Sequence, residues 1–531
     1  MVFAREVADY VVVGAGSAGS VVVRRLLEAG RSVHVIEAGS ADTDPRIHSL
    51  QGWPLLLGSP QDWGMFTAPQ QHANNRRLFW PRGKVLGGSS SLNGMIYMRG
   101  HASDYERWAQ VTGDPSWGWD QVLPLFKRSE AHELGGDEYH GAIGPLPVST
   151  ISNPHPLSEA FVEGALALGH KWIEDFNAEE MVGVGYNHIT ALRGERMSAW
   201  KSFVAPMQVH PRLTVTTSAL VHRVLLEKGQ AVGVEYSQGS QPLQRAYARA
   251  EVVLSAGVLG SPKVLLLSGI GPSAHLQSVG VTTIVDLPAV GANLHDHLLV
   301  SNIYEAKKPL TVGANNLLEA QLYARSSGWQ GAAPNLQPLF IHIPYAAGGG
   351  PVPEHGYTIA AGLVAPKARG TLRLASADPS DPPLADPNVL ADPSDLEAMV
   401  DAVEICRDIG ASAAFMLWRK AEVAPGPAAA NRNALRAFVR QAVGTYHHQV
   451  GTCKMGAADD PNAVVQPDLR VRGVEGLRVA DASVMPTITT GNTNAPTIMI
   501  GEHAADLLLN GDHFARRASR DDHRSRVFHA N

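Results

Sequence analysis

The alternation of apolar and polar residues is clearest at the start of the chain, where it predicts a β-α-β unit. Residues 10–13 form a β-branched apolar run, the pattern of a strand that is buried on both faces of a sheet. Residues 20–27 then show helical spacing, Gly30 ends that helix, and residues 32–36 return to the strand pattern. Because parallel strands need a crossover connection, two strands around one helix predict a parallel α/β sheet.

The turn between the first predicted strand and the helix carries three spaced glycines. Gly14 allows the tight turn, Gly16 lets a pyrophosphate approach the backbone, and Gly19 lets helix and strand pack closely. The phosphates of a dinucleotide would lie at the helix N-terminus, where free N–H groups and the helix dipole favour anions. Glu37 ends the second strand and can accept hydrogen bonds from a ribose, but it would repel the 2′-phosphate of NADP. The pattern predicts a dinucleotide site and leaves FAD and NAD open.

A second glycine-rich stretch, RGKVLGGSSSLNGMIYMRG, covers residues 82–100. The backbone of Gly87 and Gly88, with serine hydroxyls beside it, could form a nest for an anion. Alternatively, the serines cap a helix that begins near Leu92. The sequence shows no second complete G-x-G-x-x-G unit for a nicotinamide cofactor, so one long dinucleotide suits both stretches.

Farther along the chain, the patterns predict an antiparallel sheet and a long helix. GYTIAAGLVAP (356–366) and GTLRLAS (370–376) have the composition of strands in such a sheet. DPSDLEAMVDAVEICRDIGAS has helical spacing, and we expect this helix to begin at Ser394 or Asp395 and to end at Gly410.

Composition and charge narrow the class of protein. The 531 residues, 44% hydrophobic and 18% charged, suffice for two large or three ordinary domains, at roughly 100–200 residues each. The formal net charge of −6 argues against a nucleic-acid surface. The two cysteines, Cys406 and Cys453, cannot build a disulfide framework and are typical of a reducing compartment.

The chain carries no signal of export or of membrane insertion. Its N-terminus lacks the secretory signal pattern, and no apolar run reaches the roughly 18–20 residues that span a bilayer. We therefore predict a cytoplasmic protein without an integral membrane span, and leave peripheral membrane contact open.

Three further segments, together with the two glycine stretches, resemble the signatures of one family. They are VVLSAGVLGSPKVLLLSGIGP (252–272), TYHHQVGTCKMG (445–456) and GLRVADASVMPTITTGNTNAPTIMIGEHAADLL (476–508). In this order they resemble the glucose-methanol-choline (GMC) oxidoreductases, and HANNR, RGHASDYERWA and GTCKMG resemble the bacterial choline dehydrogenase and sorbose dehydrogenase branch. The resemblance implies FAD, an α/β Rossmann-like FAD/NAD(P)-binding GMC fold, and a second, α+β substrate domain built on an antiparallel sheet.

The same resemblance implies a discontinuous division of the chain. The FAD-binding domain is expected at 1–155, 212–305 and 440–512, and the substrate-binding domain at 156–211 and 306–439. Residues 513–531 are polar and mixed in charge, which predicts a flexible tail.

The resemblance also implies which residues hold the cofactor. The expected cofactor-binding residues are Gly14, Gly16, Ser17, Ala18, Gly19, Glu37, Ala38, Arg82, Gly87, Gly88, Asn93, Val221, Ala256, Asp481, Ala482, Asn492 and Asn494. Some family members attach FAD covalently through a histidine just before the asparagine of the second glycine loop. Here that position is Leu92, so we expect FAD to be held without a covalent bond.

No metal site is expected from the sequence. His295, Asp296 and His297 have the spacing of metal ligands. In the GMC family, a related run of residues has a structural role near the flavin. The resemblance implies the same role for these residues. Cys453 is expected to be a small packed residue.

Oxidation of an alcohol requires one group that accepts the hydroxyl proton and another that steadies the oxygen. Neutral histidine suits the first task because its unperturbed pKa is about 6.5. Counting along the family motifs places this base at His448 and its partner at Asn492. Adjacent residues on a strand point to opposite faces, so we expect His447 to face away from the substrate.

The resemblance predicts FAD-dependent oxidation of a primary or secondary alcohol, such as a polyol, a sugar or a choline-like compound. Electrons would pass to a quinone or dye. An alcohol oxidase that reduces oxygen is a close alternative. A lyase of the same fold, in which the flavin does no redox work, is the alternative from another class.

Overall fold

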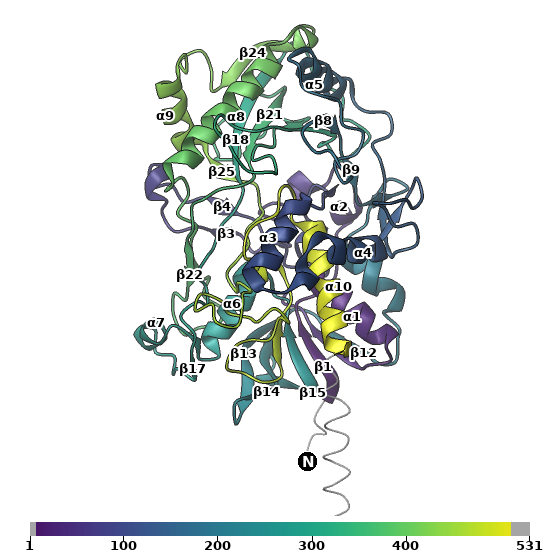
Figure 1. Cartoon of the computed structure of the whole chain (residues 1–531), viewed down its shortest axis with the longest axis vertical. Coiled ribbons are helices and arrows are strands. Elements are labelled where there is room, and N and C mark those ends of the chain that lie inside the picture. Colours follow the sequence, from purple (N-terminus) through teal and green to yellow (C-terminus); the bar gives the residue numbers. More distant parts are fainter. Residues whose placement is uncertain (1–6, 511–531) are drawn as a thin grey trace, which may run out of the picture.

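Two sheets organise residues 7–510, the part of the chain that this computed structural model describes (Figure 1). One sheet lies at each end of the long axis of the molecule. The first is mainly parallel and the second is antiparallel, which confirms the predicted fold class. The predicted tail at 513–531 lies outside the described residues.

The first sheet contains the predicted β-α-β unit. Its strands, in spatial order, are β12 (Leu213–Thr216), β2 (Val33–Ile36), β1 (Val7–Val13), β15 (Gln244–Leu254), β14 (Gln230–Gln238) and β13 (Ala219–Glu227), and β26 (Leu477–Val479) pairs with β15. Helix α1 (Ser17–Glu28) connects β1 to β2. It begins three positions before the expected start at residue 20, because the turn is completed by Gly14, with φ +98°, and Gly16 is already the N-cap.

Helix α10 (Asn494–Asn510) lies beside α1 against the first sheet, although the two helices are far apart in the sequence (Figure 1). Gly501 makes this approach possible, since a Cβ there would lie 2.7 Å from the carbonyl oxygen of Ala18. The segment that contains Asn492, directly before α10, is therefore held against α1, the helix that follows the glycine turn.

The second sheet is antiparallel throughout. Its strands, in spatial order, are β24 (Arg419–Ala424), β18 (Leu298–Ala306), β21 (Gly356–Leu363), β20 (Leu339–Ile341), β19 (Ala320–Tyr323) and β8 (Gly183–Tyr186), and β25 (Gly444–Thr445) pairs with β18. Strand β18 begins before the expected domain boundary at 305, and β25 lies after the boundary at 440. Both nevertheless pair in this second sheet, since β25 bonds with the start of β18.

Two of the expected elements differ from the structure. The stretch 370–376 forms only the short strand β22 (Thr371–Arg373), which pairs with β23 (Leu384–Asp386) outside the second sheet, so its predicted place in that sheet is wrong. The alternative of a helix that begins near Leu92 is also wrong. A short 3-10 helix, Gly88–Ser91, ends there, because Gly87 and Gly88 both have positive φ and shape the stretch into a tight loop.

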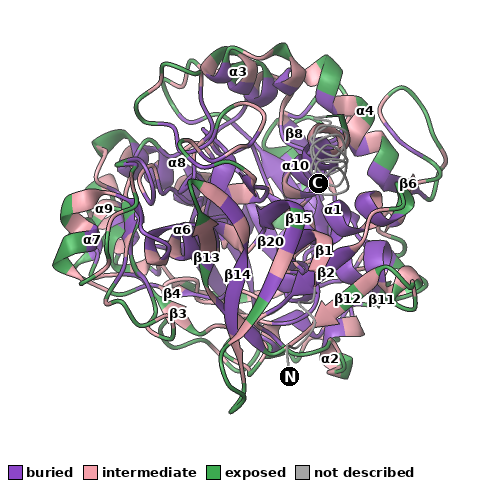
Figure 2. Cartoon of the chain, turned by 90° about the horizontal axis from the view of Figure 1, so that it is seen from below, coloured by how far each residue is buried: buried purple, intermediate pink, exposed green. Residues whose placement is uncertain are grey.

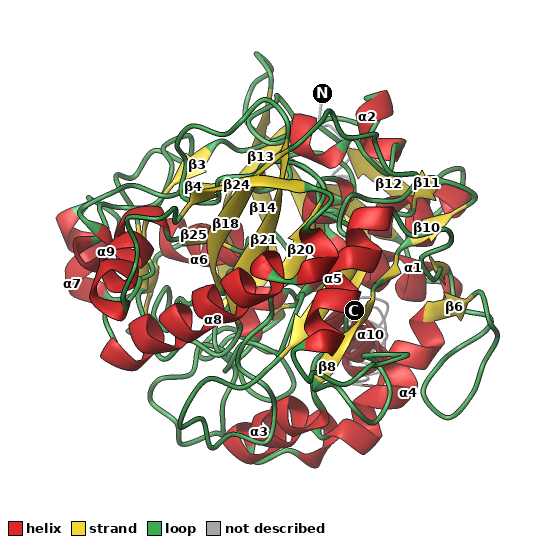
Figure 3. Ribbon diagram, turned by 90° about the horizontal axis from the view of Figure 1, so that it is seen from above, coloured by secondary structure: helices red, strands yellow, loops and turns green. Residues whose placement is uncertain are grey.

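The predicted long helix is α8 (Pro393–Ala411), which lies across the second sheet with α5 (Pro156–Ala167) beside it (Figure 3). It begins before Ser394 because Asp392 caps it through the Ser394 N–H and a proline occupies the first turn. The other helices are α2 (Pro45–His48), α3 (Ala102–Thr112), α4 (Trp119–Ser129), α6 (Gly257–Leu267), α7 (Ser273–Ser278) and α9 (Arg432–Ala442).

Short strand pairs join the loops between these elements. They are β3 (Met65–Phe66) with β4 (Phe79–Trp80), β5 (Ile96–Tyr97) with β9 (His188–Ile189), β6 (Glu130–His132) with β7 (Leu146–Val148), β10 (Ala191–Leu192) with β11 (Glu195–Arg196), and β16 (Ile270–Gly271) with β17 (Val285–Asp286).

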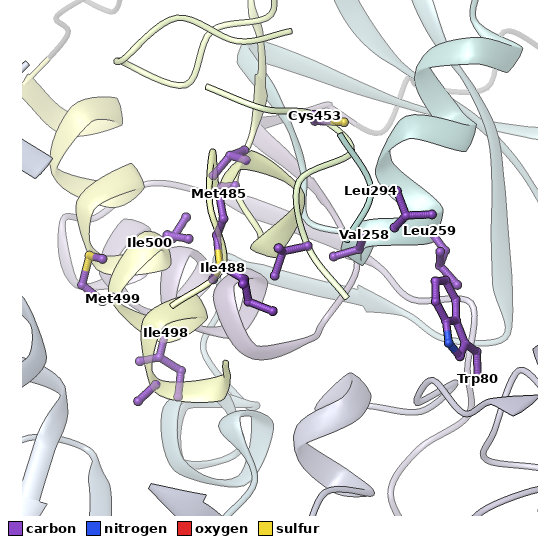
Figure 4. Close-up of a cluster of buried hydrophobic side chains, with 14 of the residues drawn as sticks. Trp80, Val258, Leu259, Leu294, Cys453, Met485, Ile488, Ile498, Met499 and Ile500 are labelled. Atoms are coloured by element: carbon purple, nitrogen blue, oxygen red, sulfur yellow. The ribbon is translucent and has the colours of Figure 1, made fainter. Parts of the chain in front are cut away.

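The core follows the central strands of the first sheet, which are buried while the outer loops are exposed (Figure 2). Cys453 lies in an apolar cluster with Leu294, Met485 and the start of α6 (Figure 4). It is a free thiol whose pKa burial raises well above the usual value, as suits a packed residue. Within residues 7–510, no helix combines the length and apolar character that a membrane span requires.

A buried carboxylate ties three helices together next to the first sheet. Glu502 on α10 has no solvent exposure, and its oxygens accept hydrogen bonds of 2.8 Å from Arg25 on α1 and from Arg128 on α4. Ser129 donates a further bond of 2.7 Å. Both arginines are partly withdrawn from water. The Glu502 carboxylate therefore compensates positive charges that water solvates only in part.

We expect Glu502→Ala to lower the free energy of unfolding by about 1.5–3 kcal/mol, because it removes a fully buried carboxylate and the hydrogen bonds that it accepts from Arg25, Arg128 and Ser129. The matched control is Glu28→Ala, since Glu28 binds the same Arg25 at 2.8 Å with 37% of its side chain exposed. That control should cost less than about 1 kcal/mol. Urea unfolding followed by circular dichroism gives both values, and equal losses would contradict the helix-tying role of Glu502.

Candidate active site

One cleft runs between the two sheets and collects almost all of the predicted site residues. Strands of the first sheet contribute Val13, Ile36 and Val221, and strands of the second contribute Leu299 and Leu339. The expected residues that line it are Gly14, Gly16, Ser17, Ala18, Glu37, Ala38, Arg82, Gly88, Asn93, Val221, Ala256, Asp481, Ala482, Asn492, Asn494 and His448. Gly19 and Gly87 are not in its lining and lie behind it.

The two glycine loops meet backbone to backbone at one end of the cleft. A Cβ on Gly19 would lie 2.1 Å from the carbonyl oxygen of Gly14, and a Cβ on Gly88 would lie 2.9 Å from the Cα of Gly16. The Cβ position of Gly16, in contrast, faces open space. The loops therefore form a cradle in front of the N-terminus of α1, the arrangement that accepts an anionic phosphate.

Two buried carboxylates hold this end of the cleft in shape. Glu37 accepts 2.8 Å bonds from the N–H groups of Ala15 and Gly39, so it fixes the glycine turn as well as facing the cleft. Asp481 accepts 2.9 Å and 2.6 Å bonds from Gly257 N–H and the Ser261 hydroxyl. Burial raises the pKa of both carboxyls.

These features fit a long dinucleotide. The glycine cradle offers space and donors for phosphates, and Glu37 lies at the end of β2, where a ribose would bind. Beyond Ala256 and Ala482, the lining of the cleft continues to the second glycine loop. Leu92, which replaces the histidine used for covalent attachment in some family members, is buried and lines the cleft beside Asn93.

His448 lies where the cleft reaches the second sheet, and three groups fix its ring. Its backbone N–H donates a 2.8 Å bond to Asp296, its Nδ1 lies 3.0 Å from Nδ1 of His297, and its Nε2 lies 3.2 Å from Nδ2 of Asn492. The ring also stacks on Tyr446 at 4.9 Å between centroids. His448 and Asn492, the predicted catalytic pair, are therefore brought into direct contact.

The hydrogen bonds define which nitrogen of His448 carries a lone pair. Gln337 Nε2 donates to the side-chain oxygen of Asn492 at 3.2 Å, so the amide nitrogen of Asn492 points at His448. An amide nitrogen only donates, so Nε2 of the neutral ring accepts and Nδ1 carries the proton toward His297. The lone pair of Nε2 therefore points at the Asn492 amide, and both side chains line the cleft.

The surroundings keep His448 uncharged. Burial, followed by the positive potential of His297, His447 and Arg82, lowers the pKa of His448 well below 6.5. Among its neighbours, His297 has its pKa lowered to about 3 by burial. His448 is therefore neutral at pH 7, the protonation state that a base must have before it accepts a proton.

His447 does not turn away from the cleft, so the expectation that the two histidines face opposite sides is wrong. Strand β25 ends at Thr445, and His447 has φ +68°, a left-handed conformation that breaks the alternation of a strand. Both rings line the cleft. Nε2 of His447 lies 3.1 Å from the Tyr345 hydroxyl, and burial with Arg82 nearby lowers its pKa to about 3.

Two further residues support the catalytic pair and were not identified as such from the sequence. Asp296 accepts bonds from Thr445 Oγ1, from Gln449 Nε2 at 2.9 Å and from His448 N–H, and burial raises its pKa to about 6. Gln337 orients Asn492. The NLHDHL run signals Asp296, whereas a single glutamine in a loop carries no local signal.

The end of the cleft around His448 is apolar. The side chains that line it there are Trp53, Leu57, Ile96, Leu299, Leu318, Leu339, Ile341, Tyr345 and Tyr446. Among the described residues that line the cleft, the carboxylates are Glu37 and Asp481, and both belong to the glycine-loop end. No carboxylate in this part of the lining faces the substrate end.

Comparison with known proteins places this architecture in one family. The GMC oxidoreductase N-terminal and C-terminal family models match residues 8–299 and 366–501. The chain is 39% identical over 516 residues to alcohol dehydrogenase [acceptor] of Pseudomonas putida, which covers 92% of this chain and 93% of that protein. It is 38% identical over 515 residues to an oxygen-dependent choline dehydrogenase of Sinorhizobium fredii, with the same coverage.

Solved structures agree with the sequence relatives. The crystal structure of pyridoxine 4-oxidase from Mesorbium loti has a TM-score of 0.90 and 37% identity, and covers 94% of this chain and 98% of that one. Formate oxidase has a TM-score of 0.88 and 27% identity, covering 96% and 99%. The chain belongs to the GMC oxidoreductases, and it is an FAD-dependent enzyme that acts on CH–OH donors.

Proposed function

We propose that this enzyme oxidises an uncharged, largely apolar alcohol, with His448 as the base and Asn492 as its partner. The observation that carries the proposal is the 3.2 Å contact between Nε2 of His448 and Nδ2 of Asn492 in the cleft wall. Atoms this close can bind a single hydroxyl oxygen from two sides. One accepts the hydroxyl proton, and the other donates to the oxygen as negative charge develops.

FAD would be held without a covalent bond by the residues of the glycine cradle and the opposite wall. Gly16 and Gly88 leave space for phosphates, Glu37 would bind the ribose, and Asn93 and Ala482 would lie along the remainder of the cofactor. Leu92 offers no nucleophile for attachment. When bound, FAD supplies the acceptor for the hydride that leaves the carbinol carbon.

Residues of this chain accept the hydroxyl proton of the substrate and stabilise the charge that it brings. His448 takes it at Nε2, because that nitrogen carries the lone pair, and the ring then becomes positive. Nδ1–H of His448 donates to His297, and Asp296 lies against the His448 backbone, so both steady the ring as its charge changes. The apolar walls exclude water from this transfer, which strengthens each of these interactions.

The apolar lining supports one substrate class over the others. Hydroxyl groups of a polyol or sugar would lie against Leu299, Leu339 and Ile341, which offer them no partner, and a choline-like cation would find no carboxylate at this end. Trp53 and Tyr446 favour a hydrocarbon or aromatic body. We therefore favour an aliphatic or aromatic alcohol over the polar substrates expected from the sequence.

We further propose that electrons leave the enzyme to a quinone-type acceptor, with oxygen as the alternative acceptor. The names of the relatives include an alcohol dehydrogenase [acceptor], which does not specify the acceptor, and an oxygen-dependent choline dehydrogenase. The free thiols of Cys406 and Cys453 support a cytoplasmic location.

Unfolding the protein in guanidinium should release its flavin. Because Leu92 cannot form a covalent link, the yellow colour should pass through an ultrafiltration membrane that retains the polypeptide. Absorbance of filtrate and retentate at the flavin maximum measures this. Colour that remains with the chain would contradict non-covalent binding.

His448→Ala should lower turnover by about 10²–10⁴-fold, the contribution of a positioned general base, and leave the bound flavin spectrum unchanged. The matched control is His447→Ala, which removes the neighbouring imidazole and its contact with Tyr345 but not the lone pair beside Asn492. Stopped-flow reduction under anaerobic conditions measures both. Equal losses in the two variants, or none in His448→Ala, would refute the assignment of the base.

Anaerobic bleaching of the flavin should separate substrate classes. Medium-chain primary alcohols and benzylic alcohols should bleach it at low concentration, whereas choline and sorbitol should not, because the pocket lacks partners for their charge and hydroxyls. Bleaching by choline in preference to hexanol would overturn the apolar assignment.

If no alcohol bleaches the flavin while a cyanohydrin is cleaved, the lyase alternative is correct. Reoxidation by a soluble quinone compared with air identifies the acceptor.

A further inference from the structure

A cluster of buried histidines lies outside the cleft and takes no part in the proposed reaction. His132 ends β6, His140 lies in the loop between β6 and β7, and His188 begins β9. One ring nitrogen of each lies within 4.8 Å of the others, and all three side chains are buried. None of them lines the cleft.

A carboxylate completes the cluster. Oδ2 of Asp175 lies 2.7 Å from Nε2 of His140, and its Oδ1 lies 3.5 Å from Nδ1 of His188. Nε2 of His132 lies 3.4 Å from the same nitrogen of His188. Three ring nitrogens within 4.8 Å of one another, and a carboxylate in contact with two of the rings, therefore form a candidate metal site.

The spacing suits a tetrahedral metal ion. Zinc binds nitrogen and oxygen ligands at about 2.0–2.1 Å in a tetrahedron, which places neighbouring ligand atoms about 3.4 Å apart. The separations of 3.4 Å and 3.5 Å around His188 match this directly. The 2.7 Å contact between His140 and Asp175 would lengthen as an ion enters. Imidazole and carboxylate are also ligands that zinc accepts.

Hydrogen-bond partners orient the proposed ligands, as the partners of metal ligands do in known zinc sites. Nδ1 of His140 lies 3.0 Å from Glu130, whose other oxygen pairs with Arg99 at 2.7 Å. Such a carboxylate–histidine contact fixes the ring and raises its basicity as a ligand. Asn177 N–H donates a 2.8 Å bond to Asp175 and holds its carboxylate in place.

The charges leave room for a cation. Arg99 and Glu130 compensate each other, both with fully buried side chains, so Asp175 provides the negative charge that faces the rings. Nε2 of His132 lies 3.4 Å from Nδ1 of His188, which in turn lies 3.5 Å from Oδ1 of Asp175. One contact must change on binding: Leu134 N–H points at Nδ1 of His132 at 3.4 Å, and this long bond is lost when that nitrogen carries the ring proton.

We propose that His132, His140, His188 and Asp175 bind a structural Zn²⁺ ion. The candidate cation site is empty in this structure. With four protein ligands it is closed, so it would hold no reacting water. It would clip together the β6–β7 connection, the segment before β8 and strand β9. Since His188 pairs with Tyr97, the neighbour of the cleft residue Ile96, the clip would support the cleft wall from behind.

The test uses tag-free, flavin-loaded enzyme from cells grown with added zinc. We expect about one zinc per chain by mass spectrometry of the metals, a fall in Tm after prolonged chelation, and recovery of Tm on adding Zn²⁺. Replacing zinc with Co²⁺ should give the visible absorption bands of tetrahedral cobalt at wavelengths beyond the flavin. Protein that contains no zinc, and neither binds added Zn²⁺ nor develops these cobalt bands, would overturn the proposal.

Two variants distinguish the site from adventitious binding. His132→Asn and His188→Asn should each lower zinc content more than about tenfold and abolish the response of Tm to chelation. The matched control is His342→Asn, another buried histidine that lies beside His155 and Glu319. It should lower Tm but keep the zinc. Full zinc content in both ligand variants would refute the site, and wild-type cobalt bands decide the matter if a variant fails to fold.

Discussion

The proposed catalytic centre depends on one buried carboxylate. Asp296 accepts the backbone N–H of His448 and two side-chain donors from the same segment, Thr445 and Gln449. This fixes a stretch that is not a regular strand, since β25 has ended and His447 adopts positive φ. The orientation of the base, its contact with His297 and its distance to Asn492 all follow from this anchor.

The cofactor end of the site could be predicted from the sequence because its requirements are local. A strand, a tight glycine turn, a helix and an acidic residue follow one another within a short stretch, and each has a single physical task. The structure places these residues along one cleft. The family order of the remaining motifs extended this to Asp481 and Asn492, far along the chain.

What escaped prediction depends on contacts between distant segments. The direction of His447 follows from one backbone dihedral, which no alternation of residues reveals. Gln337 matters only because its loop reaches Asn492, and β18 joins the second sheet because its partners, β21 and β25, come later in the chain. The four residues of the histidine cluster show no regular spacing along the chain, so no local pattern groups them.

The two halves of the catalytic pair belong to different sheets. His448 follows β25, which bonds to the second sheet, whereas Asn492 precedes α10, which is fixed to α1 and the first sheet. Gln337, from the second sheet side, closes the chain of bonds by holding Asn492. The proton-accepting geometry thus exists only when the two layers are docked in register. Activity of the proposed pair therefore requires both sheets and the contact between them, so it depends on the complete fold.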